Sequence, residues 1–151
     1  MPKAPLQIRR ARPGDLEALL GLEQRSFHTD LISRRMLRRH LANPRVILLV
    51  AAAGAEIHGD ALVFMRAGSA KARLYSIAVD GAARGTGLGA KLLDAAERAA
   101  RARGATHMRL EVGEHNAAAI ALYERRGYVR FAIRPGYYED GGTAWRYEKA
   151  L

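Results

Sequence analysis

The feature that most constrains the fold is a group of alternating glycines between an apolar strand and a long helix. Glycine stands at positions 85, 87 and 89, after the apolar residues 72–79 and at the start of a helical pattern. Glycine lets the backbone adopt positive φ and approach a ligand closely, and free N–H groups at a helix N-terminus favour an anion. The loop therefore predicts a phosphate or pyrophosphate site, with Arg84 as a forked, charged donor. A plain strand-to-helix turn capped by glycines is the alternative interpretation.

Two other phosphate-binding patterns fit this loop less well. The run Gly85-x-Gly87-x-x-Ala90 satisfies the dinucleotide fingerprint. However, the strand ends several residues too early, and only about 60 residues follow, so the second half of such a fold has no room. A nucleoside-triphosphate loop needs Gly-Lys-Ser or Gly-Lys-Thr, and neither follows.

Length and composition limit the class of protein. The chain has 151 residues and a formal net charge of +10, from 25 Lys and Arg against 15 Asp and Glu. The length and the lack of a linker or repeat predict one domain over residues 1–151. Arginine outnumbers lysine 21 to 4, and such an excess of one sign raises the local concentration of anionic ligands or partners. Cysteine is absent, which excludes disulfides, thiolate metal sites and a thioester on the enzyme.

Neither a membrane segment nor a metal site is expected from the sequence. No apolar run approaches the roughly 20 residues that cross a bilayer, and residues 1–12 carry no secretory apolar region. We therefore expect a cytoplasmic protein without membrane attachment. The histidines show no paired metal spacing and are interpreted as structural or surface residues: His28, His40, His58, His107 and His115.

Hydrophobic periodicity and turn residues divide the chain into elements in the order βααβββαβαββ. Strands are expected at residues 6–10, 46–52, 59–65, 72–79, 107–112, 128–133 and 144–151, the second to fourth of them antiparallel. Helices are expected at residues 16–27, 33–43, 88–103 and 117–126, the last with Asn116 as its cap. In the second helix the periodicity places Met36, Leu37, His40 and Leu41 inward and Arg34, Arg35, Arg38 and Arg39 outward.

A set of motifs runs from the strand before the glycines to the last helix. These are Ile77-Ala78-Val79, Arg84-x-x-Gly87-x-Gly89, and Asn116 followed by Leu122-Tyr123 and Gly127-Tyr128. Together they resemble the GNAT superfamily of acyl-CoA-dependent N-acetyltransferases. Leu110-Glu111-Val112, residues 116–123 and Tyr137-Tyr138 further resemble the bacterial ribosomal-protein alanine N-acetyltransferases. The specific match runs from about residue 74 to residue 151, whereas residues 1–70 match only in element order.

The resemblance implies an α+β fold, with a mixed, mostly antiparallel central sheet of about seven strands and about four flanking helices. It implies acetyl-CoA as the co-substrate and no metal. The backbone of Ile77, Ala78 and Val79 would pair with the pantetheine arm like an added strand. Asn116 and Tyr123, about two turns apart on one helix face, would face the same cofactor. The CoA pyrophosphate would lie on the backbone N–H groups of the glycine loop, which are those of Arg84, Gly85, Thr86, Gly87, Leu88 and Gly89.

Acetylation of an amine needs a deprotonated amine, donors for the oxyanion and a proton for the departing thiolate. Tyr123 is the candidate acid, because a phenol with a pKa near about 10 is protonated at neutral pH. A core aromatic is the alternative for Tyr123. Glu111 alternates out of phase with Leu110 and Val112, and the resemblance makes it the candidate general base. A solvent-facing strand carboxylate is the alternative for Glu111. An N-terminal amine has a pKa of roughly 8, against about 10.4 for lysine, so one water relayed to Glu111 suffices.

The resemblance also suggests residues that bind the acceptor. Tyr137 and Tyr138 match paired tyrosines that hold the first residues of a peptide, and Phe27 lies in the loop that walls the same pocket. The alternatives are a tyrosine pair that packs the turn after Pro135-Gly136 and a phenylalanine that ends the core face of the first helix.

The leading hypothesis is direct transfer of an acetyl group from acetyl-CoA to a primary amine, foremost the α-amine of a peptide or protein, by a monomer or a homodimer. A non-catalytic module that binds CoA or nucleic acid is the alternative, against which Glu111 and Tyr123 argue. The expected acceptor side is basic, which favours an acidic peptide, an anionic small amine or an aminoacylated RNA as acceptor over a basic ribosomal tail. A merely solvated face is the other interpretation of these arginines, which are Arg25, Arg34, Arg35, Arg38, Arg39 and Arg45.

Overall fold

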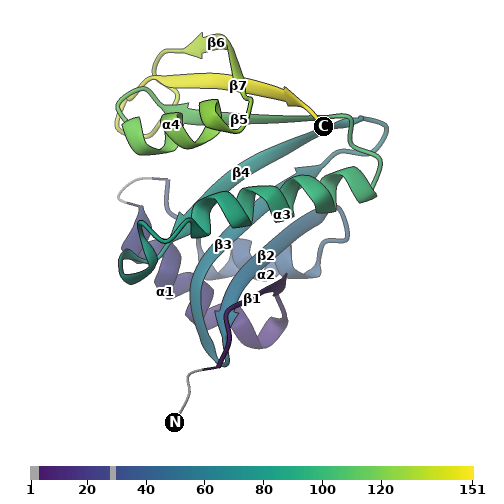
Figure 1. The fold of residues 1–151 in the computed structure, drawn as a ribbon, viewed down its shortest axis with the longest axis vertical. Helices are drawn as coiled ribbons and strands as arrows, with labels where there is room; N and C mark the ends of the chain where they lie inside the picture. The colour runs from purple at the N-terminus through teal and green to yellow at the C-terminus, as the bar shows by residue number, and fades with distance from the viewer. Residues whose placement is uncertain (1–3, 28–29) are drawn as a thin grey trace.

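The computed structural model describes residues 4–27 and 30–151, which leaves His28 outside the described residues. Over these residues the elements follow the predicted order, with a 3-10 turn before the first and the third helix (Figure 1). The strands are β1 Gln7–Arg10, β2 Val46–Ala53, β3 Glu56–Met65, β4 Lys71–Val79, β5 His107–Gly113, β6 Val129–Arg134 and β7 Ala144–Ala150. The helices are α1 Leu16–Ser26, α2 Arg34–Ala42, α3 Leu88–Ala102 and α4 Ala117–Arg125, and the 3-10 turns are η1 Pro13–Asp15 and η2 Gly81–Ala83.

The strands form one mixed sheet in the order β1-β2-β3-β4-β5-β7-β6. The pairs on both sides of its centre are antiparallel, as predicted for the meander of β2, β3 and β4. β4 and β5 are parallel, because α3 carries the chain from the end of one strand back to the start of the other. The predicted fold class, a mostly antiparallel sheet of seven strands flanked by helices, is confirmed.

The sheet opens between β4 and β5. These strands pair only from Lys71 beside His107 to Leu74 beside Leu110, although both strands continue beyond that point. The register of β3 and β4 shifts at the same level, where Tyr75 is the extra residue between the partners of Val63 and Leu62. A bulge of this kind bends its strand and increases the local twist. The bulge therefore lies where β4 turns away from β5 and leaves one edge of β4 without a strand.

Two apolar clusters hold the layers together. One lies between the sheet and the helices α3 and α4, and includes Leu92, Met108 and Leu110. The other lies on the opposite face under α1 and α2, and includes Leu19 and Leu37. Helices α1 and α2 pack on β2, β3 and β4, whereas β5, β7 and β6 lie beyond them (Figure 1). One face of the C-terminal half of the sheet is therefore without a helical cover.

The predicted Asn116 cap of α4 is confirmed, and α2 begins where it was expected, with Ser33 as its cap. The Ser33 hydroxyl accepts from the Met36 N–H at 3.1 Å, and Asn116 Oδ1 accepts from the Ala119 N–H at 3.2 Å. Phe27 does not continue α1 but ends it, with an extended backbone.

The inward placement of Met36 is wrong, since this side chain is 41% exposed. The buried stripe of the short helix α2 is narrower than the periodicity indicated and centres on Leu37. Within the described residues, no helix has both the length and the apolar character that a bilayer crossing requires.

Candidate active site

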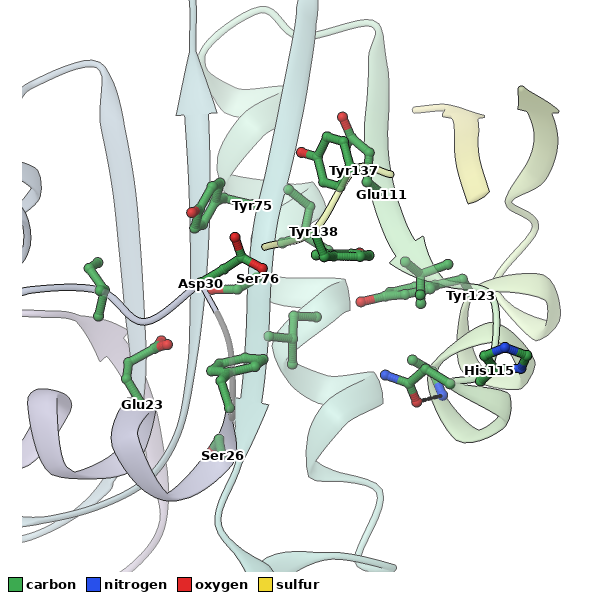
Figure 2. Close-up of a pocket in the computed structure, with 18 of the residues that line it drawn as sticks. Glu23, Ser26, Asp30, Tyr75, Ser76, Glu111, His115, Tyr123, Tyr137 and Tyr138 are labelled. Carbon is green, nitrogen blue, oxygen red and sulfur yellow. Dashed lines mark hydrogen bonds between the residues drawn. The ribbon is translucent and has the colours of Figure 1, made fainter. Parts of the chain in front are cut away.

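The opening between β4 and β5 forms a cavity with a volume of about 860 Å³ (Figure 2). Its walls come from β4, β5, the segment after α1, the start of α4 and the loop between β6 and β7. Side chains from these separate segments converge on the opening, as Figure 2 shows for Glu111, Tyr123 and Tyr138. The cavity thus brings together all the predicted catalytic and acceptor residues, which are Phe27, Glu111, Tyr123, Tyr137 and Tyr138. Of the other predicted cofactor-binding residues, Ile77 and Asn116 line it too.

The free edge of β4 presents backbone groups to this opening. The Asp80 N–H donates to the His58 carbonyl of β3 at 2.8 Å. Because successive residues of a strand direct their N–H and C=O groups to opposite sides, the groups of Ile77 and Val79 point away from β3, toward the gap. The Ala78 side chain is buried on the α1 side. The backbone groups of Ile77 and Val79 can therefore hydrogen-bond to an extended ligand. Such a ligand would take the place next to β4 that β5 leaves empty where the two strands diverge.

The glycine loop lies beyond the end of β4 and outside the walls of the cavity. Gly85 and Gly87 have φ of +77° and +81°, a region that favours glycine. Gly87 is the N-cap of α3 and provides no side-chain cap, so the N–H groups of Leu88 and Gly89 have no partner within the helix. The Leu88 side chain is buried in the core, which leaves only its backbone for a ligand. Arg84 beside the loop is exposed.

Helix α4 holds Asn116 and Tyr123 in the cavity wall, seven residues apart. The Asn116 carbonyl oxygen is used as the helix cap, so its amide N–H₂ remains to donate. Tyr123 is buried, and its ring meets Tyr128 edge to face at 5.8 Å. Burial raises the pKa of Tyr123 to about 12. Within the described residues its hydroxyl forms no hydrogen bond, and the ring projects into the cavity (Figure 2).

Glu111 lies on the face of β5 opposite to the buried Leu110 and Val112, as its alternation predicted. Its carboxylate is only 10% exposed and lies 3.3 Å from the Arg73 guanidinium and 3.8 Å from that of Arg146. Arg146 is its register partner on β7. A carboxylate held between two guanidinium groups is fixed in position at the mouth of the opening.

Arg73 is a site residue that was not identified from the sequence. Its guanidinium donates to the Tyr137 hydroxyl at 2.5 Å, lies beside Glu111, and stacks over the Tyr75 ring at 5.8 Å. The alternation of Ala72, Arg73 and Leu74 placed Arg73 on the polar face of its strand. Nothing in that alternation indicated which strand would lie next to it.

The segment after α1 and the loop between β6 and β7, which carry the predicted acceptor residues, are hydrogen-bonded to each other. The Asp30 N–H donates to the Glu139 carboxylate at 3.2 Å, and the Glu139 N–H donates to the Asp30 carboxylate at 3.4 Å. These contacts place Phe27 on the cavity wall together with Tyr137 and Tyr138, whose rings meet edge to face at 4.9 Å. Burial raises the pKa of Tyr138 well above its usual range, so its phenol stays protonated at neutral pH.

A buried carboxyl pair lies below the cavity and was also missed. Glu23 of α1 lines the cavity, and Asp60 of β3 lies beside it and is buried. Burial, and then the neighbouring Glu23 carboxyl, raise the pKa of Asp60 well above its usual range. Burial also raises the pKa of Glu23. Asp60 Oδ1 has no hydrogen-bond partner among the described residues.

The structure changes the set of arginines next to the acceptor side. Arg25 pairs with Asp80 at 3.6 Å and Arg34 with Glu17 at 2.8 Å, and both lie on the helices together with the exposed Arg35, Arg38 and Arg39. Of the six predicted arginines, Arg45 lines one of the two described cavities, and the other five line neither. The cavity that Arg45 lines is a second one, of about 730 Å³, which we call the basic groove. Its cationic side chains are Arg45, Arg66, Lys71, Arg73, Arg109, Arg134 and Arg146.

Residues of the kinds that bind metals do not gather in the described part of the chain. No group of three His, Asp or Glu side chains there has the arrangement of a metal site. His115 lines the cavity and lies 3.4 Å from Glu114, in an exposed position.

An open strand edge beside a cradle of free N–H groups suits an extended molecule that ends in a pyrophosphate. The fold and the site therefore define an acyl-CoA-binding class of protein. A family model described as Acetyltransferase (GNAT) family matches residues 16–128. The chain belongs to this family, and it is an acyl-CoA-dependent N-acetyltransferase that uses acetyl-CoA.

Two relatives of known activity are similar to the chain. Streptothricin acetyltransferase of Streptomyces lavendulae is 30% identical over 176 residues, covering 96% of this chain and 92% of the relative. The ribosomal protein bS18-alanine N-acetyltransferase of Salmonella typhimurium is 42% identical over 81 residues, which is 54% of this chain and 53% of the relative. The chain thus matches about half the length of this second relative.

Solved structures agree with the fold along nearly the whole chain. The ribosomal-protein-S18-alanine N-acetyltransferase of Escherichia coli superposes with a TM-score of 0.86 at 29% identity, over 97% of this chain and 94% of that one. Ard1 of Thermoplasma volcanium superposes with a TM-score of 0.85 at 26% identity, over 97% of both chains.

Proposed function

We propose that the protein acetylates the N-terminal α-amine of a peptide or protein by direct transfer from acetyl-CoA. The observation that carries the proposal is the arrangement of the cavity: a carboxylate, a neutral phenol and a pair of tyrosines line one opening beside the free edge of β4. The similarity to two ribosomal-protein alanine N-acetyltransferases also supports a peptide acceptor.

The co-substrate fits residues that the protein leaves unpaired. Ile77 and Val79 offer backbone groups to the pantetheine arm, and the backbone of residues 85–89 offers N–H groups to the pyrophosphate. The Arg84 N–H already donates to the Gly81 carbonyl at 3.3 Å, so Arg84 contributes its exposed guanidinium instead. The Asn116 amide has donors left after it caps α4. Acetyl-CoA supplies the activated acetyl group.

Two side chains handle the protons of the transfer. Glu111, directly or through one water, takes a proton from the acceptor ammonium, and the neutral amine attacks the thioester carbonyl. The amide C–N bond forms, the C–S bond breaks, and the nitrogen releases a second proton, which restores the one that Tyr123 gives to the sulfur. Tyr123 donates a proton to the departing sulfur, because its raised pKa keeps the phenol protonated at neutral pH. The chain has no cysteine to carry the acetyl group, which agrees with direct transfer.

The acceptor end of the cavity favours an amine that is easily deprotonated. An α-amine has a pKa of roughly 8, against about 10.4 for a lysine side chain, so a single carboxylate is enough to activate it. Phe27, Tyr137 and Tyr138 supply the apolar and hydrogen-bonding surface for the first residues of a peptide.

A small cationic amine is the second candidate acceptor. One relative that matches nearly the whole chain is a streptothricin acetyltransferase. Four carboxylates line the cavity against one guanidinium, that of Arg73, and such a lining attracts an ammonium group. The four are Glu23, Asp30, Glu111 and Asp140.

The test compares CoA release by the purified protein on three acceptor sets. These are peptides with a free N-terminus and varied first residues, the same peptides with a blocked N-terminus, and small polyamines. Turnover of the free peptides that is absent from the blocked ones supports the proposal. Turnover of polyamines alone assigns the second candidate, and no turnover of any amine contradicts both.

A further inference from the structure

The basic groove lies on the helix-free face of the sheet and carries a strong excess of positive charge. Seven cationic side chains line it, against one carboxylate, that of Glu111. Its floor is formed by neighbouring strands in register: Arg73 on β4 lies beside Arg109 on β5, and Glu111 on β5 lies beside Arg146 on β7. Residues paired in register point to the same face, so these charges form one continuous surface.

Most of this charge is not neutralised by the protein. The single carboxylate of Glu111 forms ion pairs with both Arg73 and Arg146, and Glu148 pairs with Arg109. Arg45, Arg66 and Arg134 form no ion pair with any carboxylate in the described part of the chain. These three side chains are exposed at the rim of the groove and come from three different segments. Arginines without partners that converge from separate segments are suited to an external anion.

The groove adjoins the active-site cavity. Arg73, Glu111 and Tyr137 line both, so the boundary between the cavity and the basic surface is only these three side chains wide. The charge changes sign at this junction, from a cavity lined by four carboxylates and one guanidinium to a groove lined by seven cations and one carboxylate. The ligand that matches both parts has an amine at one end and negative charge behind it.

From this juxtaposition we infer that the acceptor is a peptide whose residues after the first few are acidic, laid along the basic groove while its α-amine lies beside Glu111. The inference rests on the proposed function and specifies its substrate class. An extended peptide advances about 3.3 Å per residue, so successive acidic side chains reach successive arginines of the groove. The peptide separates its charges as the protein does, with the amine in the acidic cavity and the carboxylates on the guanidinium groups.

A nucleic acid matches the two parts less well. Its backbone carries a negative charge at every step, including those that would pass Glu111 and the other carboxylates of the cavity. Exposed aromatic side chains on which bases stack would be required for a single strand. The Phe131 ring is 44% exposed, but the guanidinium groups of Arg109 and Arg146 lie against it at 4.8 and 5.0 Å and compete with a base for its face.

The test uses three peptides with identical first residues and a tail of Glu, Gln or Lys. It measures kcat/KM for each with acetyl-CoA in excess, at low and at high ionic strength. We expect the Glu tail to exceed the Gln tail by roughly tenfold or more at low ionic strength, with most of the gain in KM, because the tail binds alike before and during the transfer. High ionic strength should reduce this ratio. The Lys tail should be the poorest of the three.

A pair of matched variants locates the effect. The double variant Arg66→Gln/Arg134→Gln removes two rim charges, and the Glu-to-Gln ratio should fall several-fold toward one. The double variant Arg98→Gln/Arg101→Gln removes the same charge from the exposed face of α3, outside both cavities, and should keep the ratio of the unmodified protein. Because each ratio compares two peptides on one variant, a partial loss of folded protein cancels.

The outcomes separate the inference from the function on which it rests. Equal kcat/KM for Glu and Gln tails, or a ratio that the two double variants reduce alike, overturns the inference while peptide acetylation stands. No turnover of any of the three peptides, with turnover of a small amine, overturns the proposed function and the inference with it. Steeply salt-dependent inhibition by an oligouridylate, with no advantage of the Glu tail, reassigns the groove to nucleic acid.

Discussion

Replacement of Tyr123 by phenylalanine should separate catalysis from stability. The phenol has no hydrogen-bond partner in the described structure and its oxygen is not among the buried unpartnered atoms, so its removal leaves no protein group unpaired. We therefore expect a free energy of unfolding that is unchanged to within about 1 kcal/mol. As the acid that protonates the thiolate, the same phenol should contribute roughly 10²- to 10⁴-fold in kcat, which is about 3 to 5 kcal/mol of barrier.

Tyr128 provides the matched control, because its ring lies next to that of Tyr123 at 5.8 Å. Its hydroxyl donates to the buried Glu97 at 2.8 Å, and Lys149 pairs with the same carboxylate at 2.9 Å. Tyr128→Phe should therefore lower the free energy of unfolding by about 1 to 3 kcal/mol and leave the Tyr123 phenol in place.

The assays are CoA release under saturating substrates and unfolding by urea. A Tyr123→Phe enzyme that keeps kcat within about threefold would refute the assignment of the acid, since a general acid contributes at least about 10². A second check is the alkaline limb of kcat. Tyr123 has a pKa of about 12. At pH values up to about 10, ionisation of this phenol should therefore cause no decrease in kcat.

Three further substitutions test the cradle, the base and the buried carboxyl pair. Gly87→Ala has free space for the added methyl group but a φ of +81°, so it should destabilise the protein by about 1 to 2 kcal/mol and weaken acetyl-CoA binding in calorimetry; unchanged affinity and stability would contradict the cradle. Glu111→Gln should reduce kcat/KM by about 10- to 100-fold near pH 7, and by less above about pH 9, where the amine is already neutral; a loss independent of pH would argue for a positioning role. The raised pKa of Asp60 stabilises the fold only below the ordinary pKa of a carboxyl, and this contribution is lost as the pH rises. Asp60→Asn should therefore raise the unfolding free energy near pH 8 by on the order of 1 kcal/mol, and by less near pH 4; an equal effect at both would show that the pair does not titrate.

Local patterns were sufficient for most of the fold. The alternation of residues 107–112 placed Glu111 on the polar face of its strand, and the Asn116 side chain fixed the start of the last helix. These features depend on neighbours in the sequence, and each has a short-range physical cause. The glycines at 85 and 87 likewise have the positive φ that their loop required.

The partners of the site residues depend on long-range pairing, and no local pattern contains that information. Arg73 reaches Glu111 because β4 and β5 are parallel and in one particular register, and Arg146 reaches it through the antiparallel pair of β5 and β7. The periodicity of α2 indicated which arginines face outward but not which part of the molecule they border. That is why the cations found next to the cavity are those of the groove of β4, β5 and β7 and not those of the helices.

The most direct test of the account is to determine which nitrogen of one acceptor receives the acetyl group. A peptide with both a free α-amine and an internal lysine is incubated with the protein and acetyl-CoA, and the product is mapped by tandem mass spectrometry. The account predicts one acetyl group on the α-amine and an unmodified lysine. Acetylation of the lysine, or of small amines but of neither nitrogen of the peptide, would contradict it.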